Sequence, residues 1–415
     1  IWQFICIVGL NIGYIFVVSD AFDYYGFQLE FDFIKFIYGN IILLTSIIIG
    51  VGINKPYYFA VWNIMFLYLL GGEVVYYQYN SGANLIQIVV IYICLLLIYL
   101  FSKTNKKFKK FPYIKNSDSV IGLITILLFV PFVVLYYKYI NLKNLLFIDV
   151  YKTRAIFSNI SDIFTAYLKA PLARVLLPVL IVKKRIKKQH FLMVLYIMML
   201  IYLYLCGALK SIFIGLIAVV IFFKGTYVRK TLLFLKGVAF IMYVGTATYL
   251  TTGNVFLLDA LGRRVFFVPA QLGNVYYNYF HDKLTYLSHS PFGLGIVEYP
   301  YDRPIVKYVG EIVLGTPGLS ANVGIFTEGI ISFGLLGGIL GALIVSLIIL
   351  YFDMIDIDKR FFGIIFVYIY YMNTSLFSTL LLTHGLFFLI IFSYFFLREK
   401  SDMYSNKYKE FDYKK

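Results

Sequence analysis

Charged side chains are scarce in this sequence. Asp, Glu, Lys and Arg make up 14% of its 415 residues, whereas soluble globular domains contain about 25%. Apolar residues account for 61%, and the mean hydropathy is +0.83. Because so few polar side chains cannot cover a water-exposed surface, the composition excludes a soluble globular protein. The solvent of this chain is a lipid bilayer.

Cysteines and the common nucleotide and hydrolase motifs are also scarce or missing. The three cysteines, Cys6, Cys94 and Cys206, lie in apolar runs without metal-ligand spacing, so they predict neither a disulfide scaffold nor a zinc site. The sequence contains no GxxxxGK[ST], HExxH or GxSxG motif, and no GxGxxG after a strand. We therefore expect no nucleotide-driven transport, no cofactor and no metal.

Apolar runs long enough to cross about 30 Å of hydrocarbon as helices recur along the chain. They predict an all-α, polytopic membrane protein with about twelve transmembrane helices. The runs at 57–71 and 209–224 are short, and the last two share one apolar stretch with a break at 373–375. The expected spans are 1–18, 33–53, 57–71, 84–101, 119–140, 164–182, 190–207, 209–224, 233–250, 327–351, 361–379 and 380–397.

Basic residues gather in alternate connecting segments, which the positive-inside rule assigns to the cytoplasm. Both termini are then cytoplasmic. The net charge of +16 follows from this topology and from anionic inner-leaflet lipid, so no nucleic-acid partner is expected. The clusters are Lys103, Lys106, Lys107, Lys109, Lys110 and Lys115; Lys183, Lys184, Arg185, Lys187 and Lys188; and Lys224, Arg229 and Lys230.

Two connecting segments, 141–163 and 251–326, are expected outside the cytoplasm. The second is the larger and lies between the ninth and tenth spans. Loops longer than about 15 residues are usually functional or disordered. Since residues 251–326 are rich in Tyr, Phe and Gly, we expect this segment to be ordered.

Cationic side chains in and near these segments are candidate phosphate ligands. Arg154 follows Asp149 in "FIDVYKTR", and Arg263 and Arg264 open an aromatic stretch in "DALGRRVFF". A guanidinium group stays protonated and forms two charge-assisted hydrogen bonds with phosphate. Binding of lipid headgroups explains these arginines equally well.

Ionisable residues within or near the spans are functional candidates because a charge in hydrocarbon is costly. Lys210, in "CGALKS", Lys169, Arg174, Glu328 and His384 are such residues. We hypothesise that Lys210, Arg174 and the double arginine converge on one lipid-phosphate site.

A Pro- and Gly-punctuated stretch, "HSPFGLGIVEYPYDRPIVKYVGE", combines phenol rings with ionisable groups. A ring face stacks on the apolar side of a sugar, and carboxylates accept hydrogen bonds from hydroxyls. An interfacial tyrosine belt is the alternative. The stretch contains His289, Glu298, Tyr299, Tyr301, Asp302 and Arg303. Farther on, the glycines of "FGLLGGILGA" are typical of close helix packing.

The order of features resembles the Wzy-type oligosaccharide repeat-unit polymerases of O-antigen and capsule assembly. The similarity rests on "DVYKTR", "GALKS", "RRVFFVPAQLGNVYYNYF" and "GEIVLGTPGLSANVGIFTEGIISFGLLG". It implies a GT-C-like, metal-independent inverting glycosyltransferase in a bacterial cytoplasmic membrane. Such an enzyme transfers a growing glycan from undecaprenyl pyrophosphate to a lipid-linked repeat unit on the outer face. A chain-length regulator protein is a possible partner.

The resemblance also suggests roles for the candidate residues. Pyrophosphate would be held by Arg154, Arg263, Arg264, Lys210 and Arg303. The general base would be Glu328, His289, Asp302 or Asp149, and the sugar rings would contact Tyr276, Tyr277, Tyr299 and Tyr301. Two alternatives stay open: an O-antigen ligase-type transferase, and a lipid-linked oligosaccharide flippase or permease, which should show repeated halves.

Overall fold

The computed structural model describes residues 1–108, 117–146, 148–160, 162–208 and 210–398. Throughout these ranges the regular elements are helices. One isolated antiparallel β-bridge pairs Ile357 with Arg398. The predicted all-α class is confirmed. Among the described residues, seven helices are long and apolar enough to cross a membrane: Trp2–Ala21, Phe33–Val51, Pro56–Tyr79, Asp118–Tyr139, His190–Gly207, Tyr227–Thr252 and Ile325–Met354. Shorter apolar helices are Ile86–Ser102, Ile212–Ile221 and Leu386–Phe396.

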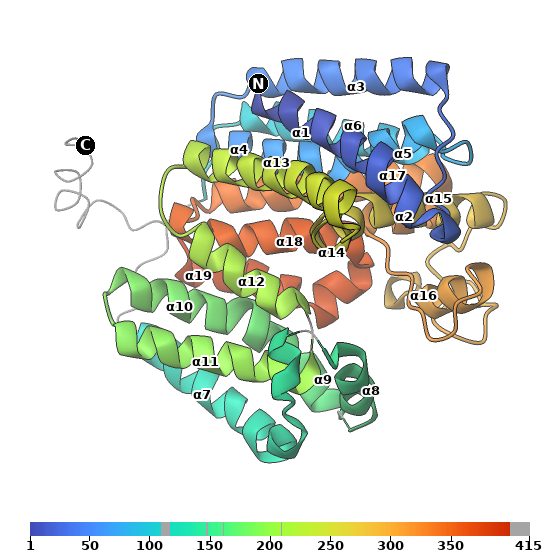
Figure 1. Ribbon diagram of the computed structural model, residues 1–415. Helices are drawn as coiled ribbons and strands as arrows, with labels where there is room; N and C mark the ends of the chain where they lie inside the picture. The colour runs from blue at the N-terminus through green and yellow to red at the C-terminus, as the bar shows by residue number, and fades with distance from the viewer. Residues whose placement is uncertain (109–116, 147, 161, 209, 399–415) are drawn as a thin grey trace. The chain divides into compact units, whose positions relative to one another are not determined.

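The chain forms two compact units. The first contains Ile1–Asn105, Gly225–Tyr351 and Ile369–Ser378. In it, α1 and α4 both pack on α13 (Figure 1). Its helices are α1 (Trp2–Gly13), α2 (Ser19–Ala21), α3 (Phe33–Val51), α4 (Pro56–Met65), α5 (Gly72–Tyr79), α6 (Ile86–Ser102), α13 (Tyr227–Thr252), α14 (Phe256–Leu258), α15 (Val268–Phe280), α16 (Ile305–Tyr308) and most of α17 (Ile325–Met354). Its π-helical turns are η1 (Tyr14–Val18), η3 (Phe66–Gly71), η7 (Asp259–Phe267) and η9 (Val309–Val313).

The second unit contains Lys106–Lys224, Phe352–Tyr368 and Thr379–Lys415. In it, α10 packs on α11 and α7, and α11 packs on α12. Its helices are α7 (Ser117–Tyr136), α8 (Val150–Ile160), α9 (Ile163–Pro171), α10 (Leu177–Ile186), α11 (His190–Gly207), α12 (Lys210–Ile221), the start of α18 (Phe362–Thr374) and α19 (Leu386–Phe396), with π-helical η6 (Leu172–Leu176) and η11 (Thr379–Thr383). α18 ends at Thr374, inside the break expected at 373–375.

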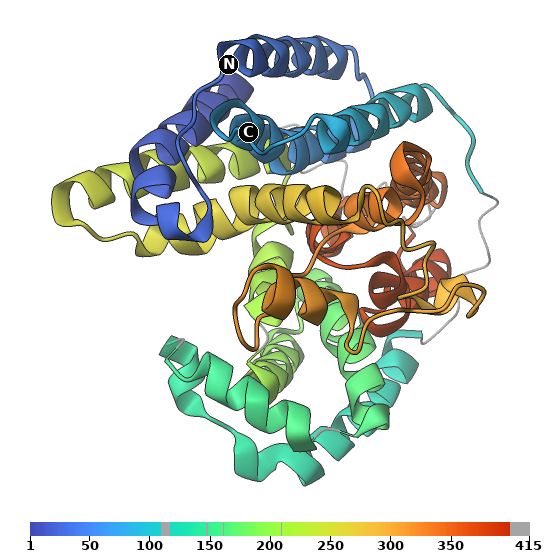
Figure 2. The ribbon, with the colours of Figure 1, turned by 90° about the vertical axis from the view of Figure 1, so that its right-hand side faces the viewer.

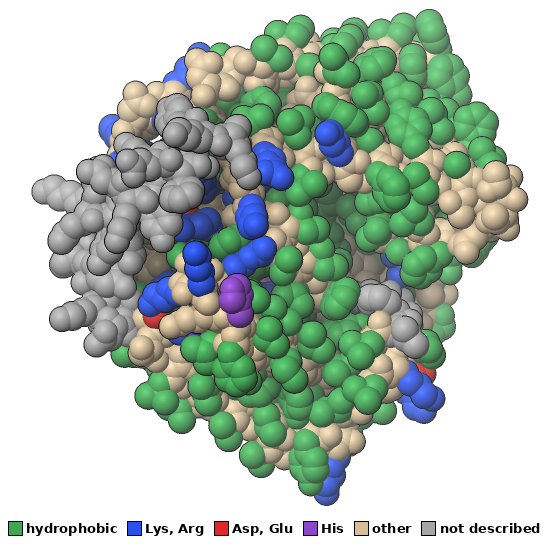
Figure 3. Space-filling model, turned by 60° about the vertical axis from the view of Figure 1, so that its left-hand side comes forward, with side chains coloured by type: hydrophobic (Ala, Val, Ile, Leu, Met, Phe, Trp, Pro, Cys, Tyr) green, Lys and Arg blue, Asp and Glu red, His purple; other side chains and the backbone are tan. Residues whose placement is uncertain are grey.

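The surface is suited to lipid. Hydrophobic side chains cover much of the face drawn in Figure 3. On α3, Ile34, Leu44 and Ile48 are all more than half exposed, as expected for a helix in contact with acyl chains. In contrast, α4, η3 and α5 form one 24-residue buried helix, so the short span expected at 57–71 extends to Tyr79.

The segment named α17 is two antiparallel arms, 325–332 and 335–354. The chain reverses at Phe333 and at Gly334, whose φ of 63° and ψ of −149° are accessible essentially to glycine alone. In a straight helix, residues sixteen apart are about 24 Å apart. Here the carbonyl oxygen of Ile325 lies 3.1 Å from the position that a Cβ on Gly341 would occupy. The expected span at 327–351 is therefore a hairpin.

Close glycine contacts hold the two arms together. A Cβ on either Gly329 or Gly337 would overlap the backbone of the other, and one on Gly338 would lie 2.9 Å from Ile330. The packing role inferred for the glycines of "FGLLGGILGA" fits Gly337, Gly338 and Gly341. Gly334 has a different role. Nothing lies within 4 Å of its Cβ position, so it makes no close packing contact, and its φ and ψ form the turn.

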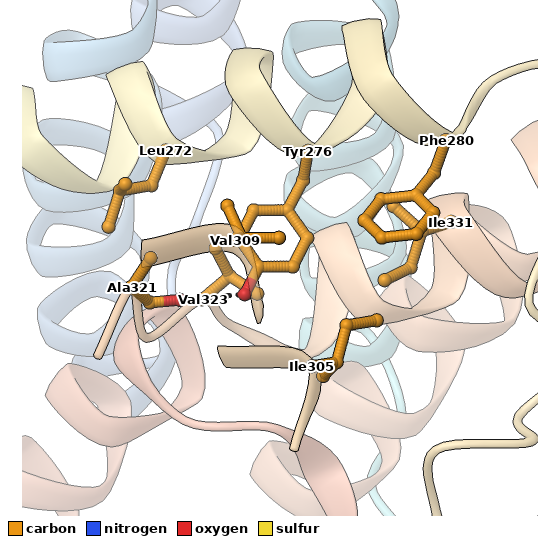
Figure 4. Close-up of a cluster of buried hydrophobic side chains, with 8 residues drawn as sticks. All are labelled: Leu272, Tyr276, Phe280, Ile305, Val309, Ala321, Val323 and Ile331. Carbon is orange, nitrogen blue, oxygen red and sulfur yellow. Dashed lines mark hydrogen bonds between the residues drawn. The ribbon is translucent and has the colours of Figure 1, made fainter. Parts of the chain in front are cut away.

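Residues 251–326 contain a hydrophobic core of their own (Figure 4). α15, shown in gold in Figure 2, contributes Leu272, Tyr276 and Phe280 to one side of this core. The hydroxyl of Tyr276 donates to the carbonyl oxygen of Ala321 at 2.8 Å, which ties α15 to the chain that enters α17. The other members are Ile305, Val309, Ala321, Val323 and, from the short arm of α17, Ile331. This core fixes the position of the short arm of α17.

Candidate functional site

His289 and Glu328, two of the four candidate bases, lie together in the first unit. Glu328 is in the first turn of the short arm of α17, and its Oε1 lies 3.4 Å from Nε2 of His289. The His289 side chain is 1% exposed and that of Glu328 is 3% exposed. Within the described part of the chain, neither His289 ring nitrogen nor Oε1 of Glu328 has a hydrogen-bond partner. Buried polar atoms in this state are rare and typical of functional sites.

Backbone and side-chain hydrogen bonds position the carboxylate of Glu328. The amide of Phe377 donates to its Oε2. The neighbouring residue, Thr327, donates to Oε1 of Gln87 at 3.0 Å, and Gln87 donates to Oε1 of Glu73 at 2.6 Å. The short arm is therefore tied to α6 and α5 on one side and to residue 377 on the other. This arrangement leaves Oε1 of Glu328 directed at His289.

The chain that carries His289 is held against the hairpin. Thr285 and Tyr286 donate backbone hydrogen bonds to the carbonyls of Ile331 and Ser332, at 2.8 and 3.2 Å. These bonds satisfy acceptors that the end of the short arm would otherwise leave unpaired. Farther along, Leu294 has a left-handed backbone with φ of 52°. The segment is anchored at Thr285 and Tyr286, and its backbone is left-handed at Tyr286, Leu287 and Leu294.

Asp302, another candidate base, is occupied by an ion pair. Arg303 donates to both of its carboxylate oxygens, at 2.9 and 2.5 Å, and also to Glu311 at 2.6 Å. The hydrogen bonds from Arg303 hold the pKa of Asp302 below its ordinary value, and the two carboxylates raise the pKa of Arg303. Because a low pKa weakens a base, this ion pair makes Asp302 a poor candidate. Arg303 in turn has its charge neutralised locally.

Arg263 and Arg264 lie on either side of one carboxylate in η7. Nη2 of Arg263 is 2.5 Å and Nε of Arg264 is 3.1 Å from Asp259. A π-helix bonds residues five apart, so positions four and five after Asp259 share its face. Arg263 is buried and its guanidinium lies 4.1 Å from the ring centroid of Phe22, whereas the Arg264 side chain is 45% exposed.

The tyrosines expected to bind sugar differ in accessibility. Tyr276 has no exposed surface and serves the core described above. Tyr277 is partly buried and its ring lies 5.5 Å from that of His281. Tyr299 and Tyr301 are also partly exposed, and the hydroxyl of Tyr299 donates to the carbonyl of Arg303 at 2.8 Å. Burial raises the pKa of Tyr299 to about 12, so its phenol is neutral at pH 7.

The remaining candidates belong to the second unit. Oδ2 of Asp149 accepts a hydrogen bond from Asn141 at 3.1 Å, just before α8 begins. On α8, Nε of Arg154 donates to the carbonyl of Ala208 at 3.1 Å. The side chain of Lys210 lies outside the described part of the chain.

Two acidic residues, Asp259 and Glu311, pair with the candidate arginines. Asp259 precedes Arg263 by four positions, a spacing that indicates an ion pair along a helix, whereas its pair with Arg264, five positions on, depends on the π-helical turn. Glu311 follows Arg303 by eight positions across a turn, and no local pattern signals that pair. In both cases, the number of arginines in the sequence does not show that nearby carboxylates neutralise part of their charge.

No protein-family model, no curated protein and no solved structure matches the chain. Within the described ranges, no three His, Cys, Asp or Glu side chains are grouped so that they could hold a metal ion.

Proposed function

We propose that this protein is a Wzy-type polysaccharide polymerase with about twelve spans and a GT-C-like architecture in a bacterial cytoplasmic membrane. Its substrates would be undecaprenyl-pyrophosphate-linked oligosaccharides, processed on the outer face. The observation that carries the proposal is a buried pair, formed by His289 of the segment between two long apolar helices and Glu328 at the start of the second of these helices.

In the proposed reaction, a hydroxyl of the incoming repeat unit attacks the anomeric carbon of the growing glycan. A new glycosidic C–O bond forms, the bond from the anomeric carbon to the pyrophosphate oxygen breaks, and undecaprenyl pyrophosphate leaves with the electron pair. The hydroxyl proton passes to Glu328, and His289 stabilises the carboxylate before transfer. General-base assistance of this kind contributes about 10² to 10⁴ in rate.

Access to the pair requires movement, because both side chains are buried. The segment 286–294 contains three non-glycine residues with left-handed backbone, at Tyr286, Leu287 and Leu294. Such conformations cost of order 1 kcal/mol or more each and are common where a segment rearranges. We infer that acceptor binding displaces the chain between His289 and Leu294 and exposes the base.

A gene deletion tests the proposed reaction against its alternatives. In a polymerase deletion, single repeat units still reach the cell surface and the ladder of longer chains disappears on a polysaccharide gel. Polymer that accumulates on the carrier lipid would instead identify a ligase, and repeat units trapped inside the cell would identify a flippase.

A further inference from the structure

Two cationic side chains from different helices meet at the end of α11 in the second unit. Arg154 of α8 donates to the carbonyl oxygen of Ala208, which directly follows α11. Lys169 of α9 lies against the preceding residue, Gly207, where an added Cβ would overlap the Lys169 ammonium. The glycine thus leaves the space that Lys169 occupies.

The ammonium group of Lys169 is buried without an acceptor. The residue is 4% exposed, and across the described ranges its Nζ has neither a hydrogen-bond partner nor a carboxylate within ion-pair distance. The face of the Phe157 ring, whose centroid is 3.9 Å from Nζ, attracts the cation. A buried cation without hydrogen bonds is unfavourable, and binding of an anion would offset that cost.

A third cation acts on Lys169 from within the second unit. Arg174 follows on the same continuous helix, in η6, and with Arg154 it adds positive potential at the ammonium. Arg174 also lines a small hollow of about 10 Å³, enough for about one water molecule, whose other walls include Ile212, Gly215 and Val367.

We propose that Lys169, with Arg154 and Arg174, forms an anion site for a phosphate or pyrophosphate group. This inference rests on the proposed function for its natural ligand, the pyrophosphate of the lipid carrier. Asp259 pairs with Arg263 and Arg264, and two carboxylates pair with Arg303. Across the described ranges, the ammonium of Lys169 has no acceptor for its three donors.

Purified full-length protein tests the site with inorganic pyrophosphate and farnesyl pyrophosphate as separate probes. Lys169→Met preserves the length of the side chain and removes its charge. Lys152→Met, at an exposed position of α8, is the matched control. We expect Lys169→Met to weaken binding of the recognised probe at least tenfold and Lys152→Met to change it by less than twofold. Similar wild-type affinity for both probes would mean that the phosphate group suffices, whereas tighter farnesyl binding would identify the lipid as the source.

Thermal unfolding of the ligand-free protein separates a binding role from a structural one. Because Lys169→Met removes an uncompensated buried charge, its unfolding midpoint should equal or exceed that of the wild type. A lower midpoint, or binding of both probes to Lys169→Met with wild-type affinity, would overturn the anion site. Failure of the polymerase proposal is distinguishable, since wild type would then bind pyrophosphate and make no polymer.

Discussion

At the residue scale, Glu328 offers the most direct test of the site. Replacement by Gln keeps an oxygen that can accept the hydrogen bond from Phe377 but removes the basic charge beside His289. We expect Glu328→Gln to slow polymerisation by about 10² or more while the unfolding midpoint stays close to that of wild type. Polymer length on gels and thermal unfolding in detergent measure the two effects.

The matched control for this variant is Glu298→Gln, because Glu298 is exposed. It should leave both polymer and stability unchanged. Wild-type polymer from Glu328→Gln would remove this carboxylate from the reaction, whatever the effect on stability.

The paired arginines should respond differently to truncation. Arg263 is buried, paired with Asp259 and placed over the Phe22 ring, so Arg263→Ala should destabilise the protein by about 1–3 kcal/mol. Arg264 is half exposed, and its pair with Asp259 should contribute less than about 1 kcal/mol. Unfolding midpoints of the two variants check this order. Equal midpoints would contradict the structural role assigned to Arg263.

The sequence predicts Glu328 and His289 as candidate bases, but it does not predict that they lie in contact. They are separated by 39 positions, and their approach depends on a chain reversal that local spacing does not encode. The pair of Asp259 with Arg263 can, by contrast, be predicted from the sequence, since an acid four positions before an arginine forms an ion pair on one helix face. The pair with Arg264 depends on the π-helical turn. Contacts between residues close in the chain can be predicted from the sequence, whereas contacts that depend on tertiary structure cannot.

At the element scale, the hairpin in α17 depends on Gly334. Its φ and ψ exclude a side chain, so Gly334→Ala should destabilise the protein by about 1–3 kcal/mol. Gly237 is a matched control within α13, where nothing lies within 4 Å of its Cβ position. Gly237→Ala should be neutral or stabilising by up to about 1 kcal/mol. A neutral Gly334→Ala in thermal unfolding would argue for a straight helix.

Hydropathy did not distinguish this hairpin from a straight span. Residues 327–351 form one apolar run, and both arrangements bury the same composition. The packing role predicted for the glycines of this run fits Gly337, Gly338 and Gly341. The reversal arises at Phe333 and Gly334, and a single glycine in an apolar run carries no information about its φ.

At the scale of the whole molecule, composition is enough to predict the fold class, an all-α membrane protein. The low charge and the long apolar runs predicted helical membrane spans, and seven such helices are found among the described residues. The count of twelve spans depends on short helices such as α12 and α19, whose lengths do not decide whether they cross. Orientation rests on the distribution of basic residues.

Cysteine labelling tests that orientation. The native cysteines Cys6, Cys94 and Cys206 are buried, so they should react little. In intact cells, an impermeant maleimide should label Lys283→Cys, in the segment 251–326. It should label Lys106→Cys only after the membrane is opened. The reverse pattern would place the candidate site in the cytoplasm and contradict a lipid-linked donor on the outer face.

The central claim is that Glu328 and His289 lengthen a glycan carried on lipid pyrophosphate. Purified protein in liposomes with undecaprenyl-pyrophosphate-linked repeat units measures this directly, without any nucleotide sugar. The account predicts a ladder of polymer from wild type and single repeat units from Glu328→Gln. Elongation that requires a nucleotide-linked donor, or equal ladders from both proteins, would contradict it.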